Sequence, residues 1–172
     1  GNSLDVIQER CESEAGVYAY DGAFGIALLS RHPFNSSGTI TLDSTTNRRG
    51  IIHANVAFPV SDIDVFCTHL TAVFDDIDYP KPTGSWEEEQ AAQIDVLLAD
   101  ADAKASASAS LLLGDFNTGP AGDGYDAEVA DNYVRLTATG FSNPYVDNGG
   151  TCTFCNDNPL IDATSNRVID HV

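Results

Sequence analysis

The chain has 172 residues, of which 26 are acidic and 8 are basic, so its formal net charge at pH 7 is −18. This length suits one domain with a sizeable core, and no apolar run approaches the ~18 residues of a membrane span. The acidic excess disfavours proteins that bind nucleic acid by neutralising phosphates with Lys and Arg, although a divalent ion could still bridge two anions locally.

The first predicted elements are two strands that end in polar residues. Residues 4–9 read as a strand whose last residue is the carboxylate Glu9. Residues 25–31 form a second predicted strand that ends at Ser30 and Arg31.

The next predicted strands are residues 49–54 and residues 62–70. The second of these alternates, then turns apolar, and ends in His69. A lone His at a strand end is more often structural than catalytic. However, neighbouring strands that deliver polar side chains at their C-terminal ends are typical of a site in an open α/β sheet.

A loop and a helix follow. Residues 74–84 are rich in Asp and Pro and are predicted to be a loop, and we interpret its acidic cluster at residues 75–78 as a solvated turn rather than a metal site. Residues 85–104 are predicted to be a helix with Ser85 as its N-cap and Glu88 completing a capping box. The Ala/Ser stretch at residues 105–110 reads as a linker.

Residues 111–120 (Leu-Leu-Leu-Gly-Asp-Phe-Asn-Thr-Gly-Pro) carry the most informative pattern. Three leucines predict a strand buried on both faces. On an extended backbone Asp115 and Asn117 would project to the same side, which would place a base or metal ligand beside a neutral hydrogen-bond donor. The alternative interpretation is an Asx-rich turn that closes the strand.

The C-terminal third contains an irregular connection at residues 143–166 and a predicted strand at residues 167–172. Cys152-x-x-Cys155 lacks the second Cys or His pair of a structural zinc site. We expect an oxidised clip between these two cysteines, with Cys11 free or bonded elsewhere and Cys67 buried in a strand. A disulfide would imply export, so we expect a secreted, extracellular or cell-envelope protein.

Four of these segments, taken in order, resemble the endonuclease/exonuclease/phosphatase superfamily. The matches are G-x-A-x-L-S-R at residues 25–31, T-H-L at 68–70, L-G-D-F-N at 113–117 and R-x-I-D-[YH]-V at 167–172. In addition, Arg49-Gly50 followed by residues 51–54 resembles the family strand that leads to the T-H-L motif. The resemblance implies an α/β fold, namely a four-layer sandwich of two mostly antiparallel sheets flanked by helices, as in pancreatic-type deoxyribonuclease.

The resemblance also implies metal-dependent hydrolysis of a phosphoester by in-line attack of water. In this scheme His69 hydrogen-bonds the phosphate, Asp115 orients or deprotonates the water, and Asn117 positions the water or a phosphate oxygen. Asp170 orients a later His that activates the water. His171 is the second choice for that base, because the family places an aromatic residue at its position.

The remaining implied contacts are with the metal and the substrate. Glu9 would hold Mg²⁺, or Mn²⁺ or Ca²⁺ in its place, because a carboxylate is a hard oxygen ligand. Ser30 and Arg31, together with Asn117, would contact the substrate. The acidic charge ranks a small or lipid phosphoester above DNA, and no stable partner is implied for a chain expected to be monomeric.

The sequence also departs from the family pattern. The family's opening Asn strand and its closing Ser-Asp-His strand have no counterpart in residues 1–172. We therefore expect a single, partial domain that is inactive by itself. Two alternatives of another class stay open: a degenerate family member without catalytic activity, and an acidic calcium-binding extracellular domain.

Overall fold

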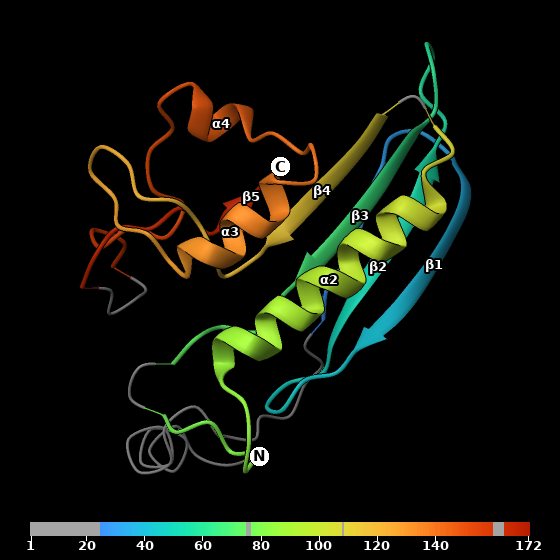
Figure 1. The fold of residues 1–172 in the computed structure, drawn as a ribbon. Helices are drawn as coiled ribbons and strands as arrows, with labels where there is room; N and C mark the ends of the chain where they lie inside the picture. The colour runs from blue at the N-terminus through green and yellow to red at the C-terminus, as the bar shows by residue number, and fades with distance from the viewer. Residues whose placement is uncertain (1–24, 75–76, 108, 160–163) are drawn as a thin grey trace, which may run out of the picture.

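The computed structural model describes residues 25–74, 77–107, 109–159 and 164–172, and these contain one sheet of five strands in the order β1-β2-β3-β4-β5 (Figure 1). The elements are β1 (Phe34–Leu42), β2 (Arg49–Val56), β3 (Ile63–His69), α2 (Trp86–Lys104), β4 (Ala109–Asp115), α3 (Ala130–Thr137), α4 (Pro144–Asp147) and β5 (Asp170–His171). The predicted α/β class is thereby confirmed, whereas the second sheet of a sandwich stays a prediction. No helix in these ranges is long and apolar enough to cross a membrane.

The sheet is mixed, and its one parallel pair is joined through α2. Strands β1, β2 and β3 are antiparallel neighbours, β4 runs parallel to β3, and β5 is antiparallel to β4. Parallel neighbours need a crossover connection, and α2 supplies it by lying across one face of the sheet (Figure 1). The C-terminal ends of β3 and β4 therefore meet at the same edge.

Helix α2 begins and ends as its sequence predicts. The Ser85 hydroxyl oxygen accepts a hydrogen bond from the Glu88 backbone N–H at 3.2 Å. Acidic residues occupy the first turn and Lys104 the last, which suits the helix dipole.

Both faces of the sheet carry apolar side chains. On one face Ile94 and Leu97 of α2 pack with Phe66 and Leu112 in the main core cluster. On the other face Val65 belongs to a smaller cluster. The predicted burial of the leucine run on both faces holds only in part, because Leu112 is buried and Leu113 packs against the smaller cluster, whereas Leu111 is 37% exposed.

Three sequence predictions need correction. Residues 25–30 pair with no strand in the described sheet, and Leu29 is 91% exposed, although Leu28 packs against the smaller core cluster. The C-terminal strand is only Asp170–His171, and β4 begins at Ala109 inside the expected linker. Strand β1 and helix α3 were not predicted, since β1 is a largely exposed, Ser- and Thr-rich edge strand.

Candidate active site

Three of the predicted site residues lie in one row across β3, β4 and β5. His69 is the register partner of Asp115, and Asp115 is the register partner of Asp170. Partners in register project their side chains to the same face at a spacing of about 5 Å. His69 Nε2 lies 3.4 Å from Asp115 Oδ2.

Gly114 allows β4 to lie close to β3 just before this row. Its φ is +132°, and a Cβ there would lie 1.9 Å from the Thr68 carbonyl oxygen, so no side chain fits. Beyond the row, the Leu70 N–H donates to the Asp115 carbonyl at 3.0 Å, and the Phe116 N–H donates to the Ile169 carbonyl at 2.8 Å. The backbone thus holds the three strand ends together.

Burial shifts the pKa values of His69 and Asp115 so that the uncharged form of each is favoured. Desolvation lowers the pKa of His69 to about 4, with a further lowering by the nearby Arg49 guanidinium and an opposing effect of Asp170. Desolvation raises the pKa of Asp115 to about 6; the Asn117 N–H and Arg49 oppose this shift, and Asp170 adds to it. At neutral pH His69 is therefore neutral. Asp115 is ionised, but burial destabilises its charged form. Strongly shifted groups in contact are typical of functional sites.

Asn117 lies beside Asp115 but not in the predicted way. Its φ is 49°, so the backbone turns instead of extending, and the expectation of two parallel side chains on an extended strand is wrong. The Asn117 N–H donates to Asp115 Oδ1 at 2.9 Å, and its side-chain Nδ2 donates to the Leu70 carbonyl at 2.9 Å. The Asx turn orients the carboxylate and fixes the amide at the end of β3.

Gln90 of α2 is a supporting residue that the sequence analysis missed. It is fully buried, and its Nε2 donates to the carbonyls of Thr71 and Asn117 at 2.8 Å each. Its Oε1 accepts from Asn132 Nδ2 at 2.8 Å. A Gln four residues before Ile94 lies on the buried stripe of the helix, and this spacing could have revealed it.

His171 does not reach the site. Its Nδ1 lies 2.7 Å from Asn143 Nδ2, and its Nε2 lies 2.7 Å from the Thr118 carbonyl. These partners require a neutral ring that carries its proton on Nε2. The ring also packs against Phe116 and Tyr133. Because both nitrogens are engaged, His171 is held in a structural position, and Asp170 is the member of the pair that faces His69 and Asp115.

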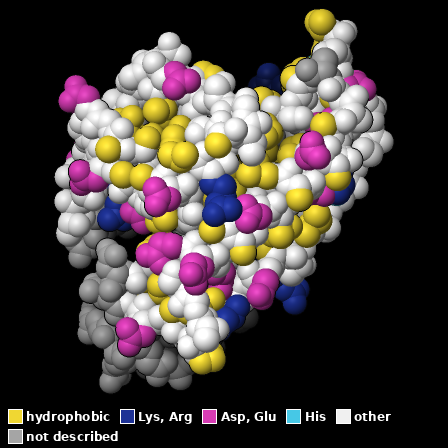
Figure 2. Space-filling view, in the orientation of Figure 1, with side chains coloured by type: hydrophobic (Ala, Val, Ile, Leu, Met, Phe, Trp, Pro, Cys, Tyr) yellow, Lys and Arg dark blue, Asp and Glu magenta, His cyan; other side chains and the backbone are white. Residues whose placement is uncertain are grey.

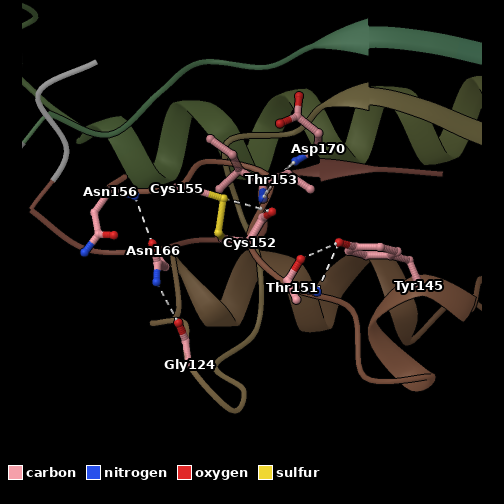
Figure 3. Close-up of a disulfide and its surroundings, with 10 residues drawn as sticks. Gly124, Tyr145, Thr151, Cys152, Thr153, Cys155, Asn156, Asn166 and Asp170 are labelled. Atoms are coloured by element: carbon pink, nitrogen blue, oxygen red, sulfur yellow. Dashed lines mark hydrogen bonds between the residues drawn. A yellow bond between two sulfur atoms is a disulfide. The ribbon is translucent and has the colours of Figure 1, made fainter. Parts of the chain in front are cut away.

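A disulfide loop holds the strand that presents Asp170 (Figure 3). The predicted Cys152–Cys155 clip is confirmed, and Cys67 is a free, half-buried cysteine. Between the bonded cysteines, Thr153 Oγ1 accepts from the N–H groups of Ile169 at 3.0 Å and Asp170 at 3.1 Å. The clip therefore positions the backbone of Asp170.

The other predicted contacts are not brought into the row. Ser30 and Arg31 are exposed, and Ser30 Oγ accepts from the His32 N–H at 3.0 Å. Glu9, Cys11, Asp75 and Asp76 lie outside the described residues. Within the described ranges no group of three or more His, Cys, Asp or Glu side chains could by itself hold a metal ion.

Comparisons with known proteins place this geometry in context. A model of the Endonuclease/Exonuclease/phosphatase family matches residues 5–172, whereas a comparison with curated proteins found no match. The fold is similar to that of TDP2 from D. rerio, solved with a single-strand DNA product (TM-score 0.56, 20% identity, 80% of this chain and 51% of that chain). It is also similar to an endonuclease/exonuclease/phosphatase family protein from Bacteroides thetaiotaomicron (TM-score 0.52, 15% identity, 81% of this chain and 49% of that chain). The aligned part of this chain thus corresponds to about half the length of each of these proteins.

Proposed function

The chain belongs to the endonuclease/exonuclease/phosphatase family, whose members are generally metal-dependent phosphoester hydrolases, and from this premise we propose that it hydrolyses a small or lipid phosphodiester. The observation that carries the proposal is the row His69, Asp115 and Asp170, in which an imidazole and two carboxylates lie on adjacent strands in register.

The chain's own residues supply the proton chemistry of this reaction. A neutral His69 has one N–H to donate to a phosphoryl oxygen, where it stabilises charge that develops in the transition state. Ionised Asp115 accepts a hydrogen bond from the attacking water and thereby orients it. Asn117 stabilises this carboxylate through its backbone N–H.

A divalent metal fits the residues that are present. The pKa of Asp115 is raised partly by the charge of Asp170, so the two carboxylates repel each other. A cation between or beside them would relieve that repulsion, and their hard oxygens suit Mg²⁺ or Mn²⁺. We propose that Glu9 completes this ligand set, as the sequence predicts. When bound, the metal supplies positive charge to the phosphoryl and leaving oxygens.

The charge of the chain supports the choice of substrate. Acidic side chains are spread over the face seen in Figure 2, and basic ones are few there. With a net charge of −18, the chain has little capacity to track a nucleic-acid backbone. DNA is the second candidate, because TDP2 was solved with a single-strand DNA product.

The test uses the protein at its full natural length with Mg²⁺ or Mn²⁺ and four substrates in parallel. These are bis-p-nitrophenyl phosphate, sphingomyelin, p-nitrophenyl phosphate and plasmid DNA. We expect turnover of the small diester and faster hydrolysis of sphingomyelin than of DNA. EDTA should abolish the hydrolysis of every substrate. Rapid nicking of plasmid without lipid turnover would reverse the substrate ranking. No turnover of any substrate would support the degenerate, non-catalytic alternative.

A further inference from the structure

Arg49 is a buried cation with unused hydrogen-bond donors. This first residue of β2 is 6% exposed, yet its Nε and Nη1 have no hydrogen-bond partner within the described ranges. A buried guanidinium whose N–H groups are unpaired is strongly unfavourable. Such a group calls for a partner, and the Nε and Nη1 donors are available to bind one.

The nearby carboxylates do not fill that role. Asp115 and Glu89 both interact electrostatically with Arg49, but burial still lowers the pKa of the guanidinium. Glu89 accepts hydrogen bonds from Thr71 Oγ1 at 2.8 Å and Tyr79 Oη at 3.0 Å. Asp115 accepts from the Asn117 N–H and lies against His69. The two carboxylates therefore balance the charge of Arg49 at a distance while their oxygens are used elsewhere.

Arg49 and His69 line one cavity. Its volume is about 250 Å³, and Gly25, Thr41 and Gly50 line it as well. The proximity of Arg49 to the row is also seen in the lowered pKa of His69, to which the guanidinium contributes.

We propose that Arg49 binds the phosphoryl oxygens of the substrate in this cavity beside His69, an inference that rests on the phosphoester hydrolysis proposed above. A guanidinium presents its N–H donors in a fixed plane, which suits the oxygens of a tetrahedral phosphoryl group. In a chain with only 8 basic residues against 26 acidic ones, a buried cation beside the reacting group gives the anionic substrate a local attraction that the surface lacks.

A purely structural role for Arg49 makes a different prediction. If the guanidinium only balances Asp115 and Glu89, any cation at this position would serve, and lysine would replace it without loss. Binding of two phosphoryl oxygens instead requires the planar fork. The substitution Arg49→Lys therefore separates the two roles.

The probe is inorganic phosphate, and the protein is used at full natural length. Binding is measured by calorimetry in EDTA, and competitive inhibition is measured during turnover of bis-p-nitrophenyl phosphate with Mg²⁺. For Arg49→Lys we expect phosphate binding to weaken about tenfold or more, because a charge-assisted hydrogen bond is lost. We expect a parallel rise in KM and an unchanged unfolding midpoint. The matched control is Arg135→Gln, which removes a full charge from a surface side chain that pairs with Asp95 and should change phosphate binding less than twofold.

Three results would overturn the proposal. The first is unchanged phosphate binding and KM in a folded Arg49→Lys protein, and the second is an equal loss in Arg135→Gln. The third needs no variant: an Arg49 Nε–H resonance that does not move when phosphate is added to the wild-type protein. Phosphate binding is measured without turnover, so an inactive protein would contradict the proposed function but would still report on Arg49.

Discussion

Replacing Asp115 by Asn is expected to stabilise the protein while it removes activity. In the folded state burial raises the pKa of Asp115 from 3.8 to about 6. Since the folded state holds this proton more tightly than the unfolded chain, stability falls as the pH rises from about 4 to about 6 and stays lower above that. Asn has the same shape, keeps an oxygen that accepts from the Asn117 N–H, and carries no charge.

The size of the effect follows from the shift. About two pKa units at ~1.4 kcal/mol each set an upper limit of about 3 kcal/mol. The Asp115 side chain is 29% exposed, and Arg49 loses a balancing charge in the variant, so we expect a gain of about 1–2 kcal/mol at pH 8. Near pH 4 most of the gain should disappear, because the carboxyl is then protonated in the folded state and only about half ionised in the unfolded chain.

The assay is urea unfolding in EDTA at pH 4 and pH 8. Added Mg²⁺ should reduce the stability difference between the variant and the wild type. A cation bound by Asp115 stabilises the buried carboxylate of the wild type, and the Asn variant lacks that carboxylate. Asp95→Asn is the control, since Asp95 is 59% exposed and pairs with Arg135 at the surface; its effect should stay within about 0.5 kcal/mol. The reasoning is refuted if Asp115→Asn is equally destabilising at both pH values.

Three further predictions concern the residues that support the site. Gln90→Leu removes the donors to the carbonyls of Thr71 and Asn117, so urea unfolding should show a loss of about 1–3 kcal/mol and the diesterase rate should fall; an unchanged midpoint would contradict the buried contacts. Thr153→Val should lower kcat and stability while Thr153→Ser retains both, because only Ser keeps the oxygen that accepts from the Asp170 N–H; equal kinetics for the two variants would count against this role. Reduction of Cys152–Cys155 should destabilise the protein by about 2 kcal/mol for so short a loop, as measured by unfolding with and without dithiothreitol.

Strand patterns were sufficient to predict that His69 and Asp115 lie at the ends of neighbouring strands, because these patterns are local, whereas Asp170 was assigned through the family resemblance. The apolar runs before His69 and Asp115 mark strands of the sheet, and both strands end in chemistry-bearing side chains. Parallel pairing of β3 and β4 then brings those ends together. The α2 boundaries were equally predictable, since Ser85 and the acidic first turn act within a few residues of each other.

The remaining features depend on contacts between distant segments. Asn117 adopts a left-handed conformation, and its side-chain amide bonds a carbonyl of the preceding strand, which no spacing rule reveals. His171 is fixed by Asn143 and Thr118, both far away in the chain. Arg49 is the first residue of a predicted strand, and only the folded chain reveals its burial.

The most direct test of the account is the rate of Mg²⁺-dependent hydrolysis of bis-p-nitrophenyl phosphate after His69→Ala, compared with His53→Gln. His53 lies on β2 near Asp100 of α2, outside the row of His69, Asp115 and Asp170, so it controls for loss of an imidazole elsewhere on the sheet. The account predicts that kcat/KM falls by about 10²–10⁴ for His69→Ala and stays near the wild-type value for His53→Gln. Near-normal turnover by a folded His69→Ala protein would mean that the reaction takes place elsewhere.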